Sequence, residues 1–161
     1  SVSGLNVYAY GTVNGATGAG ILAFADSADR AFVVLSSGAQ VSGATFAIEN
    51  NGSGSTILVE GGAELIGDVS LNDGSDTLAI LGATLTNVSL LDGGDDISTG
   101  DTFVDRLNFS GFTGTLGADL RNWENISVSG GQLSYTGPAI DTGELVVGQN
   151  GRLTVTQPNF V

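Results

Sequence analysis

The chain of 161 residues contains no cysteine, no methionine and no histidine, and its four basic residues are all arginine. The absence of cysteine rules out disulfides. The absence of both cysteine and histidine rules out the usual zinc sites and every Ser-His or Cys-His nucleophile pair. Proline occurs only twice, towards the C-terminal end, where it interrupts strands least. We therefore expect stability to come from packing and backbone hydrogen bonds.

Basic charge is also scarce. Seventeen acidic residues against four arginines give a formal net charge of −13. This charge opposes binding to nucleic acid or to an anionic membrane, so we expect no nucleic-acid partner. The acidity fits solubility, attraction of cations or a basic target. The sequence has no run of eighteen apolar residues and no signal-peptide pattern, and its start at Ser1 instead of Met predicts a fragment or a processed product.

Helix signals are nearly missing as well. Glycine makes up 26 residues, β-branched residues dominate the apolar runs, and polarity alternates with a period of two. An all-β chain is predicted. Over positions 1–56 the expected strands are Leu5–Tyr10, Gly20–Phe24, Ala31–Leu35 and Val41–Ile48.

The dominant positive feature is repetition. Residues 69–78 return in type nineteen residues later as 88–97, which aligns Asp73 with Asp92 and Asp76 with Asp95. A phrase of the form apolar-x-apolar-x-Gly begins at Ile57, Leu78, Leu107 and Ile126, and in weaker form at Leu145. The step from Leu78 to Leu107 is longer than the other three, which are nearly equal. A period of about twenty is typical of stacked rungs, because one rung cannot bury its own apolar face.

Each rung offers further short strands. One ends in a leucine, at position 65, 85, 116, 133 or 153, and another is visible at Asp68–Leu71 and Asn87–Leu90. We therefore predict a three-faced parallel β-helix with about 20 residues per rung. Residues 1–161 form one domain in this interpretation, with irregular rungs at 1–56, regular repeats at 57–161 and an inserted loop at 98–106. A β-sandwich, a calcium β-roll and an ice-binding solenoid remain as less favoured alternatives.

Residues 107–116, Leu-Asn-Phe-Ser-Gly-Phe-Thr-Gly-Thr-Leu, and 120–133, Leu-Arg-Asn-Trp-Glu-Asn-Ile-Ser-Val-Ser-Gly-Gly-Gln-Leu, resemble the repeats of bacterial autotransporter passengers. The resemblance is specific over residues 71–133. It implies a right-handed β-helix exported by type V secretion to the surface of a Gram-negative bacterium or beyond. It also implies a C-terminal outer-membrane β-barrel in the same precursor and a stalk or adhesion role towards an unknown host receptor or surface ligand. The alternative function is a polysaccharide-processing enzyme, a lyase or glycosidase, on the same scaffold.

Five aspartates form the densest carboxylate group: Asp73, Asp76, Asp92, Asp95 and Asp96. They could share a calcium ion, yet Asp-Gly turns also recur because Asp bonds its own backbone and Gly accepts positive φ. We expect turn formers, with no metal site and no cofactor. The acid pair in Gly94–Asp96 superficially resembles that of polygalacturonases, but the chain lacks the histidine and the Arg-x-Lys of those enzymes. We therefore predict no catalytic residue and no enzyme.

Aromatic side chains could form a stacking platform for sugar rings, but a single tryptophan within an apolar repeat more often fills the interior. Phe103 differs, because it lies in the expected insertion between acids. Three Asn-x-Ser matches, at Asn87, Asn108 and Asn125, have an apolar centre expected to point inward, at Val88, Phe109 and Ile126. The aromatics expected to pack inside are Phe109, Phe112, Trp123 and Tyr135.

Overall fold

A computed structural model of the chain describes residues 4–24, 30–95, 97 and 102–156. These residues form strands and turns and contain no helix. All of their strand pairings are parallel, so the predicted all-β class is confirmed and an antiparallel sandwich does not fit. Within the same residues no helix is long and apolar enough to cross a bilayer.

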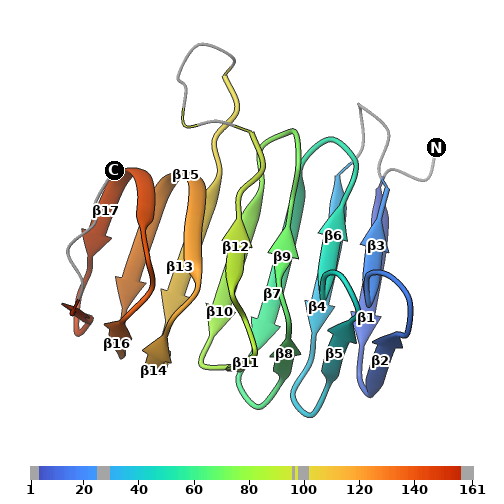
Figure 1. Cartoon of the computed structure of the whole chain (residues 1–161), viewed down its shortest axis with the longest axis horizontal. Helices are drawn as coiled ribbons and strands as arrows, with labels where there is room; N and C mark the ends of the chain where they lie inside the picture. The colour runs from blue at the N-terminus through green and yellow to red at the C-terminus, as the bar shows by residue number, and fades with distance from the viewer. Residues whose placement is uncertain (1–3, 25–29, 96, 98–101, 157–161) are drawn as a thin grey trace.

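Strands that follow one another along the chain fall into three series, and most strands pair with the one three places further on (Figure 1). The first series begins at the N-terminal end and runs the length of the molecule. It is continued by the C-terminal parts of the two longest strands, β15 (Asp119–Ser129) and β17 (Ile140–Val147). Its other members are β1 (Leu5–Ala9), β4 (Ala31–Leu35), β7 (Ser55–Glu60), β10 (Thr77–Leu81) and β13 (Arg106–Ser110).

The second and third series contain the remaining strands. The second forms two smaller sheets, one of β2 (Thr12–Gly15), β5 (Gln40–Gly43), β8 (Glu64–Ile66) and β11 (Thr84–Thr86), the other of β14 (Thr113–Leu116), β16 (Gln132–Tyr135) and β18 (Arg152–Val155). The third contains β3 (Ile21–Ala23), β6 (Ile48–Asn50), β9 (Val69–Ser70) and β12 (Leu90–Asp92). Because β15 pairs with β13 at one end and with β12 at the other, the first and third series join into one sheet that nearly closes on itself.

The first series has the register that the repeated phrase predicts. Ile57 pairs with Leu78, and Leu78 with Leu107. Leu107 in turn pairs with Ile126, and Ile126 with Leu145. The unequal spacings are therefore absorbed entirely by the turns. The reason is packing: the paired residues from Ile57 to Ile126 all point into the interior and are buried.

The nineteen-residue repeat does not set the register of the third series, and that prediction is wrong. Val69 pairs with Leu91 and not with Val88. The predicted strand at Asn87–Leu90 accordingly lies three residues later, as β12. Val69, Leu91 and Leu120 stack as a buried column, whereas Val88 is only half-buried. Burial of this apolar column therefore sets the strand register, and the sequence similarity between residues 69–78 and 88–97 does not.

The predicted leucine column of the second series is confirmed at its ends and wrong in the middle. Leu65 pairs with Leu85, and Leu133 with Leu153. Leu116, however, pairs with Tyr135, and Leu133 lies opposite a glycine, Gly114. The ring of Phe112 explains this, since a Cβ at Gly114 would lie 3.2 Å from it. Phe112 thus fills the interior space that a leucine occupies in other rungs.

The expected strands of the N-terminal third appear as β1, β3 and β4, but two details differ. The stretch predicted as one strand, Val41–Ile48, is divided into β5 and β6. The chain turns so tightly there that a Cβ at Gly43 would lie 1.9 Å from the carbonyl oxygen of Phe46. Strand β2, around Gly15, was not predicted. Its pairing with β5 shows that the irregular residues before position 56 belong to the same parallel arrangement.

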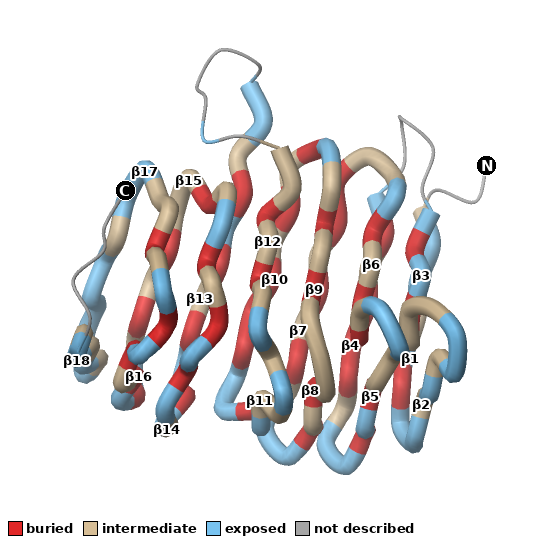
Figure 2. Tube along the Cα trace, viewed as in Figure 1, coloured by how far each residue is buried: buried red, intermediate tan, exposed pale blue. Residues whose placement is uncertain are grey.

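Buried apolar side chains form one continuous core, and Figure 2 shows buried positions recurring along the strands of the sheets. Buried and more exposed residues alternate along strands such as β7 and β13, as a half-buried strand requires. The largest side chains of the core are those of Trp123, Tyr135 and Phe109, which are all fully buried. The fold thus leaves the turns between strands as the places where polar groups can gather.

Candidate functional site: a buried acidic column beside an exposed aromatic pocket

Three consecutive turns link the third series to the first and lie next to one another along one edge of the molecule (Figure 1). Their described residues are 51–54, 71–76, and, in the third turn, 93–95, 97 and 102–105. Four of the five predicted aspartates lie in or beside these turns, and Asp96 lies outside the described residues. The predicted insertion at 98–106 also lies partly outside the described residues. Its last residue, Arg106, begins β13, and Asp105 before it is buried.

A column of polar side chains runs beside these turns, and each member stands two residues before the start of an apolar-x-apolar-x-Gly phrase. Ser55 Oγ donates to Asp76 Oδ1 over 2.5 Å. The backbone N–H of Asp76 donates to Asp105 Oδ1 over 2.6 Å, and the N–H of Asp105 donates to Glu124 Oε2 over 2.5 Å. Asp105 and Glu124 therefore each accept from a backbone N–H of the preceding member, and Asp76 accepts from the hydroxyl of Ser55. We call Ser55, Asp76, Asp105 and Glu124 the acidic column.

Burial changes the ionisation of this column. Asp76 and Asp105 have no exposed surface. Burial raises the pKa of Asp76 to about 7, although hydrogen bonds from Ser55 and Asn50 and the charge of Arg30 favour its ionised form. Burial also raises the pKa of Asp105 to about 9, and the neighbouring carboxyl groups of Asp95 and Asp76 add to that rise. Asp105 is therefore protonated at neutral pH.

The predicted alignment of Asp76 with Asp95 is wrong, because the residue one rung beyond Asp76 is Asp105. Sequence reasoning missed Asp105 by assigning it to the insertion. A signal was present: Asp76, Asp105 and Glu124 each stand two residues before an apolar-x-apolar-x-Gly phrase. The longer step between Leu78 and Leu107 hid this equivalence.

Asparagine and aspartate side chains tie the turns to one another. Asn72, at φ 53°, donates through Nδ2 to the carbonyl of Asn50 and to Oδ1 of Asn51, both over 2.6 Å. One turn further on, Asn122 Nδ2 donates to Asp92 Oδ1 over 2.9 Å. Asp92 Oδ1 also accepts from the N–H of Gly94, and burial raises its pKa. Asp92 is thus a turn former, as expected.

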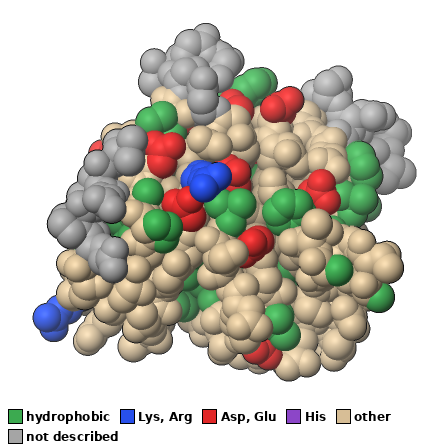
Figure 3. Space-filling model, viewed as in Figure 1, with side chains coloured by type: hydrophobic (Ala, Val, Ile, Leu, Met, Phe, Trp, Pro, Cys, Tyr) green, Lys and Arg blue, Asp and Glu red, His purple; other side chains and the backbone are tan. Residues whose placement is uncertain are grey.

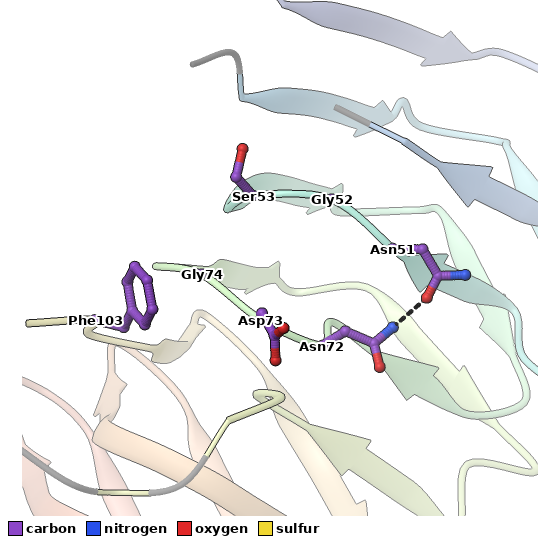
Figure 4. Close-up of a pocket in the computed structure, with 7 residues that line it drawn as sticks. All are labelled: Asn51, Gly52, Ser53, Asn72, Asp73, Gly74 and Phe103. Carbon is purple, nitrogen blue, oxygen red and sulfur yellow. Dashed lines mark hydrogen bonds between the residues drawn. The ribbon is translucent and has the colours of Figure 1, made fainter. Parts of the chain in front are cut away.

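Beside the column lies an open pocket of about 380 Å³, lined by Asn51, Gly52, Ser53, Asn72, Asp73, Gly74 and Phe103. Figure 4 shows the Phe103 ring beside the Gly74 end of its turn and the Asn72 amide directed at Asn51. A second hollow of about 340 Å³ also includes Phe103, together with Ile97, Thr102, Val104, Glu124, Asn125 and Gly143. Phe103 therefore borders both cavities.

Phe103 is 42% exposed, yet the chain on both sides of it is constrained. Thr102 before it has φ 73°. Val104 after it donates its N–H to Ser75 Oγ over 3.0 Å, and Asp105 is held by the acidic column. The fold thus presents an aromatic ring to solvent from an anchored backbone.

The other predicted aromatics lie inside. Trp123 is fully buried and donates Nε1–H to the carbonyl of Leu91 over 3.0 Å. Phe109 and Phe112 pack together with ring centroids 5.5 Å apart. Tyr135 is buried and bonds the carbonyl of Ala118 over 2.9 Å, and burial raises its pKa to about 12. Their interpretation as interior packing is confirmed, and so is the inward position of Phe109 and Ile126 in two Asn-x-Ser matches.

The charge around the site is negative. Acidic side chains are spread over the face in Figure 3, with few basic ones. Of the arginines, Arg121 pairs with Asp119 over 2.6 Å, and Arg106 donates to the carbonyl of Val104. Across the described ranges no three acidic side chains converge in the way that a metal site requires.

Comparison with known proteins identifies no relative of this chain. No protein-family model, no curated protein and no solved structure matches the chain significantly. Function therefore has to be argued from the residues of this chain.

Proposed function

We propose that this chain is a stalk-like segment of an autotransporter passenger, displayed at the surface of a Gram-negative bacterium or released from it, which acts by binding. In this proposal the parallel fold is a right-handed, three-faced β-helix with rungs of about 20 residues. The observation that carries the proposal is the first-series register, in which Ile57, Leu78, Leu107, Ile126 and Leu145 follow one another as partners.

Two further features support it. The two segments at 107–116 and 120–133 that resemble passenger repeats supply neighbouring rungs, since β13 pairs with β15 and β14 with β16. A cysteine-free chain also suits export in an unfolded state, because no early disulfide can form during translocation. A rod of this kind spaces a binding face from the cell without chemistry of its own.

The acidic column argues against the enzyme alternative. Glycosidases use one protonated and one ionised carboxyl group, and Asp105 with Asp76 offers such a difference in pKa. Both groups, however, are completely buried and bonded to backbone of adjacent rungs, so no substrate atom can reach them. The raised pKa values of Asp76 and Asp105 therefore result from their burial in the fold and do not indicate a catalytic role.

The proposal is tested by display. Residues 1–161 fused ahead of an autotransporter barrel should reach the surface of Gram-negative cells, become accessible to external protease and raise adhesion to epithelial layers above that of cells carrying the barrel alone. Export without increased adhesion would leave only a spacer role. Release of reducing sugars or unsaturated uronates from polysaccharides by the purified chain would favour the enzyme.

A further inference from the structure

The exposed ring of Phe103 has no counterpart among the buried aromatics of the repeat. Burial in the core does not account for its position, because 42% of its surface is accessible and it borders two cavities. Its backbone is nevertheless fixed by Ser75 through Val104. A constrained, solvent-facing aromatic ring beside a polar cavity is a common element of ligand sites.

Two polar side chains beside the ring, Asn72 and Asp73, offer acceptor atoms. Both hydrogens of the Asn72 amide are used within the turns, so its Oδ1 is the atom left to meet a ligand. Asp73 is exposed, and its carboxylate accepts no hydrogen bond from the described residues. An ionised carboxylate only accepts. The pocket thus combines an apolar ring with acceptors for hydroxyl hydrogens.

This combination excludes some ligands. The residues lining the pocket include no arginine, and the chain has no lysine or histidine, so phosphate, sulfate and uronate groups would find no cationic partner and would be repelled by Asp73 and by the net charge. A cationic ligand would find a single carboxylate and a single ring, with the remaining side chains of the pocket uncharged. Sugar rings carry both an apolar C–H face and several hydroxyl donors.

We propose that the pocket formed by Phe103, Asn72 and Asp73 binds a residue of a neutral glycan. The ring of Phe103 stacks on the C–H face of the sugar, and Asp73 and Asn72 Oδ1 accept hydrogen bonds from its hydroxyl groups. This inference deepens the proposed binding role and rests on it. It names neutral polysaccharide as the class of surface ligand.

The neighbouring turns position this site. Gly74 has φ 123°, and a Cβ there would lie 2.2 Å from the backbone N of Gly54 in the preceding turn. The two turns therefore pack backbone against backbone. Phe103 comes from the third turn and borders the pocket formed by the first two. Three rungs thus contribute to one site.

Affinity electrophoresis of the purified chain tests the inference, with mannan, galactan or dextran in the gel. We expect retardation by at least one of them, with Kd raised at least tenfold by Phe103→Ala and raised by Asp73→Ala. Phe24→Ala is the matched control, because Phe24 is also an exposed phenylalanine but does not line this pocket, and it should bind like wild type.

A second arm separates sugar from cation binding. Retardation by neutral polysaccharide should persist from low to high NaCl, whereas binding to poly-lysine weakens as salt screens charge. Absence of retardation in all three gels, equal loss in Phe24→Ala, or binding to poly-lysine alone would overturn the inference. Because the assay uses purified protein, failure here combined with adhesion of displaying cells would refute only the glycan site.

Discussion

Asp76 and Asp105, far apart in sequence, are joined by a hydrogen bond of 2.6 Å from the backbone N–H of Asp76 to Oδ1 of Asp105. The second oxygen of the Asp76 carboxyl group is buried without a hydrogen bond among the described residues, and the Asp105 carboxyl group lies against the carboxyl group of Asp95. Such an arrangement disfavours negative charge, because an ion without solvation is costly. The fold therefore retains protons here that the unfolded chain would release.

This relationship predicts that the protein loses stability as pH rises. Below about pH 4 both carboxyls are protonated in the folded and the unfolded chain. Between about pH 4 and the raised pKa values, about 7 for Asp76 and about 9 for Asp105, only the folded chain keeps its protons. We expect Tm to fall by at least about 5 °C from pH 5 to pH 9, since about 1 kcal/mol moves the Tm of a domain this size by about 2–4 °C. Circular dichroism melts across that range measure it.

The substitution Asp105→Asn tests whether Asp105 causes the fall in Tm with rising pH. Asparagine keeps an oxygen to accept from Asp76 but does not titrate, so the dependence of Tm on pH should become shallower and the variant should exceed wild type at pH 9. Asp73→Asn removes an exposed carboxyl from the neighbouring turn and should leave the slope as it is. An unchanged slope in Asp105→Asn would contradict our assignment.

A charge in the apolar column should be poorly tolerated. Val128 is buried and pairs with Phe109 on one side and Val147 on the other. Val128→Asp should lower the free energy of unfolding by about 3 kcal/mol or more, because the carboxylate has no partner there. Ser110→Asp places the same group on an exposed position of β13 and should cost less than about 0.5 kcal/mol. Urea unfolding gives both values, and similar losses would reject the inward assignment of Val128.

Close approach of turns makes Gly94 irreplaceable by any residue with a side chain. It has φ 126°, and a Cβ would lie 1.5 Å from the carbonyl oxygen of Asn72. Gly94→Ala should therefore destabilise the chain by more than about 2 kcal/mol. Gly11→Ala is the control, because a Cβ there meets nothing within 4 Å. Thermal melts of the pair should differ clearly, and a Gly94→Ala variant as stable as its control would show that the turns do not pack in this way.

Calcium should have no effect on stability. Asp92 Oδ1 already accepts hydrogen bonds from Asn122 Nδ2 and from the N–H of Gly94. We expect the same Tm with calcium and with EGTA. A bound ion would instead add about 2.7 kcal/mol at a hundredfold excess over Kd. A drop of several degrees on chelation that Asp92→Asn abolishes would identify the Asp-Gly turns as a calcium site.

Much of the strand pairing could be predicted from the sequence. Apolar side chains that share one core must recur at regular intervals, and this spacing is visible in the sequence. The phrase starting at Ile57, Leu78, Leu107 and Ile126 specified the pairing of the first series residue by residue. The interior position of Trp123 followed from the same reasoning. These features depend only on which residues avoid water.

The site was decided by tertiary structure. The similarity of residues 69–78 to 88–97 predicted a register that burial of Leu91 on Val69 overrides, since an apolar column contributes more than matching turn letters. Asp105 is the neighbour of Asp76 because Arg106 pairs with Thr77 in the first series, across the longest step of the repeat. Whether a carboxyl is a solvated turn former or a buried proton carrier depends on which rung covers it. Sequence alone determined the repeat and the class of fold, and only the packing of one turn against the next determined the acidic column and the exposure of Phe103.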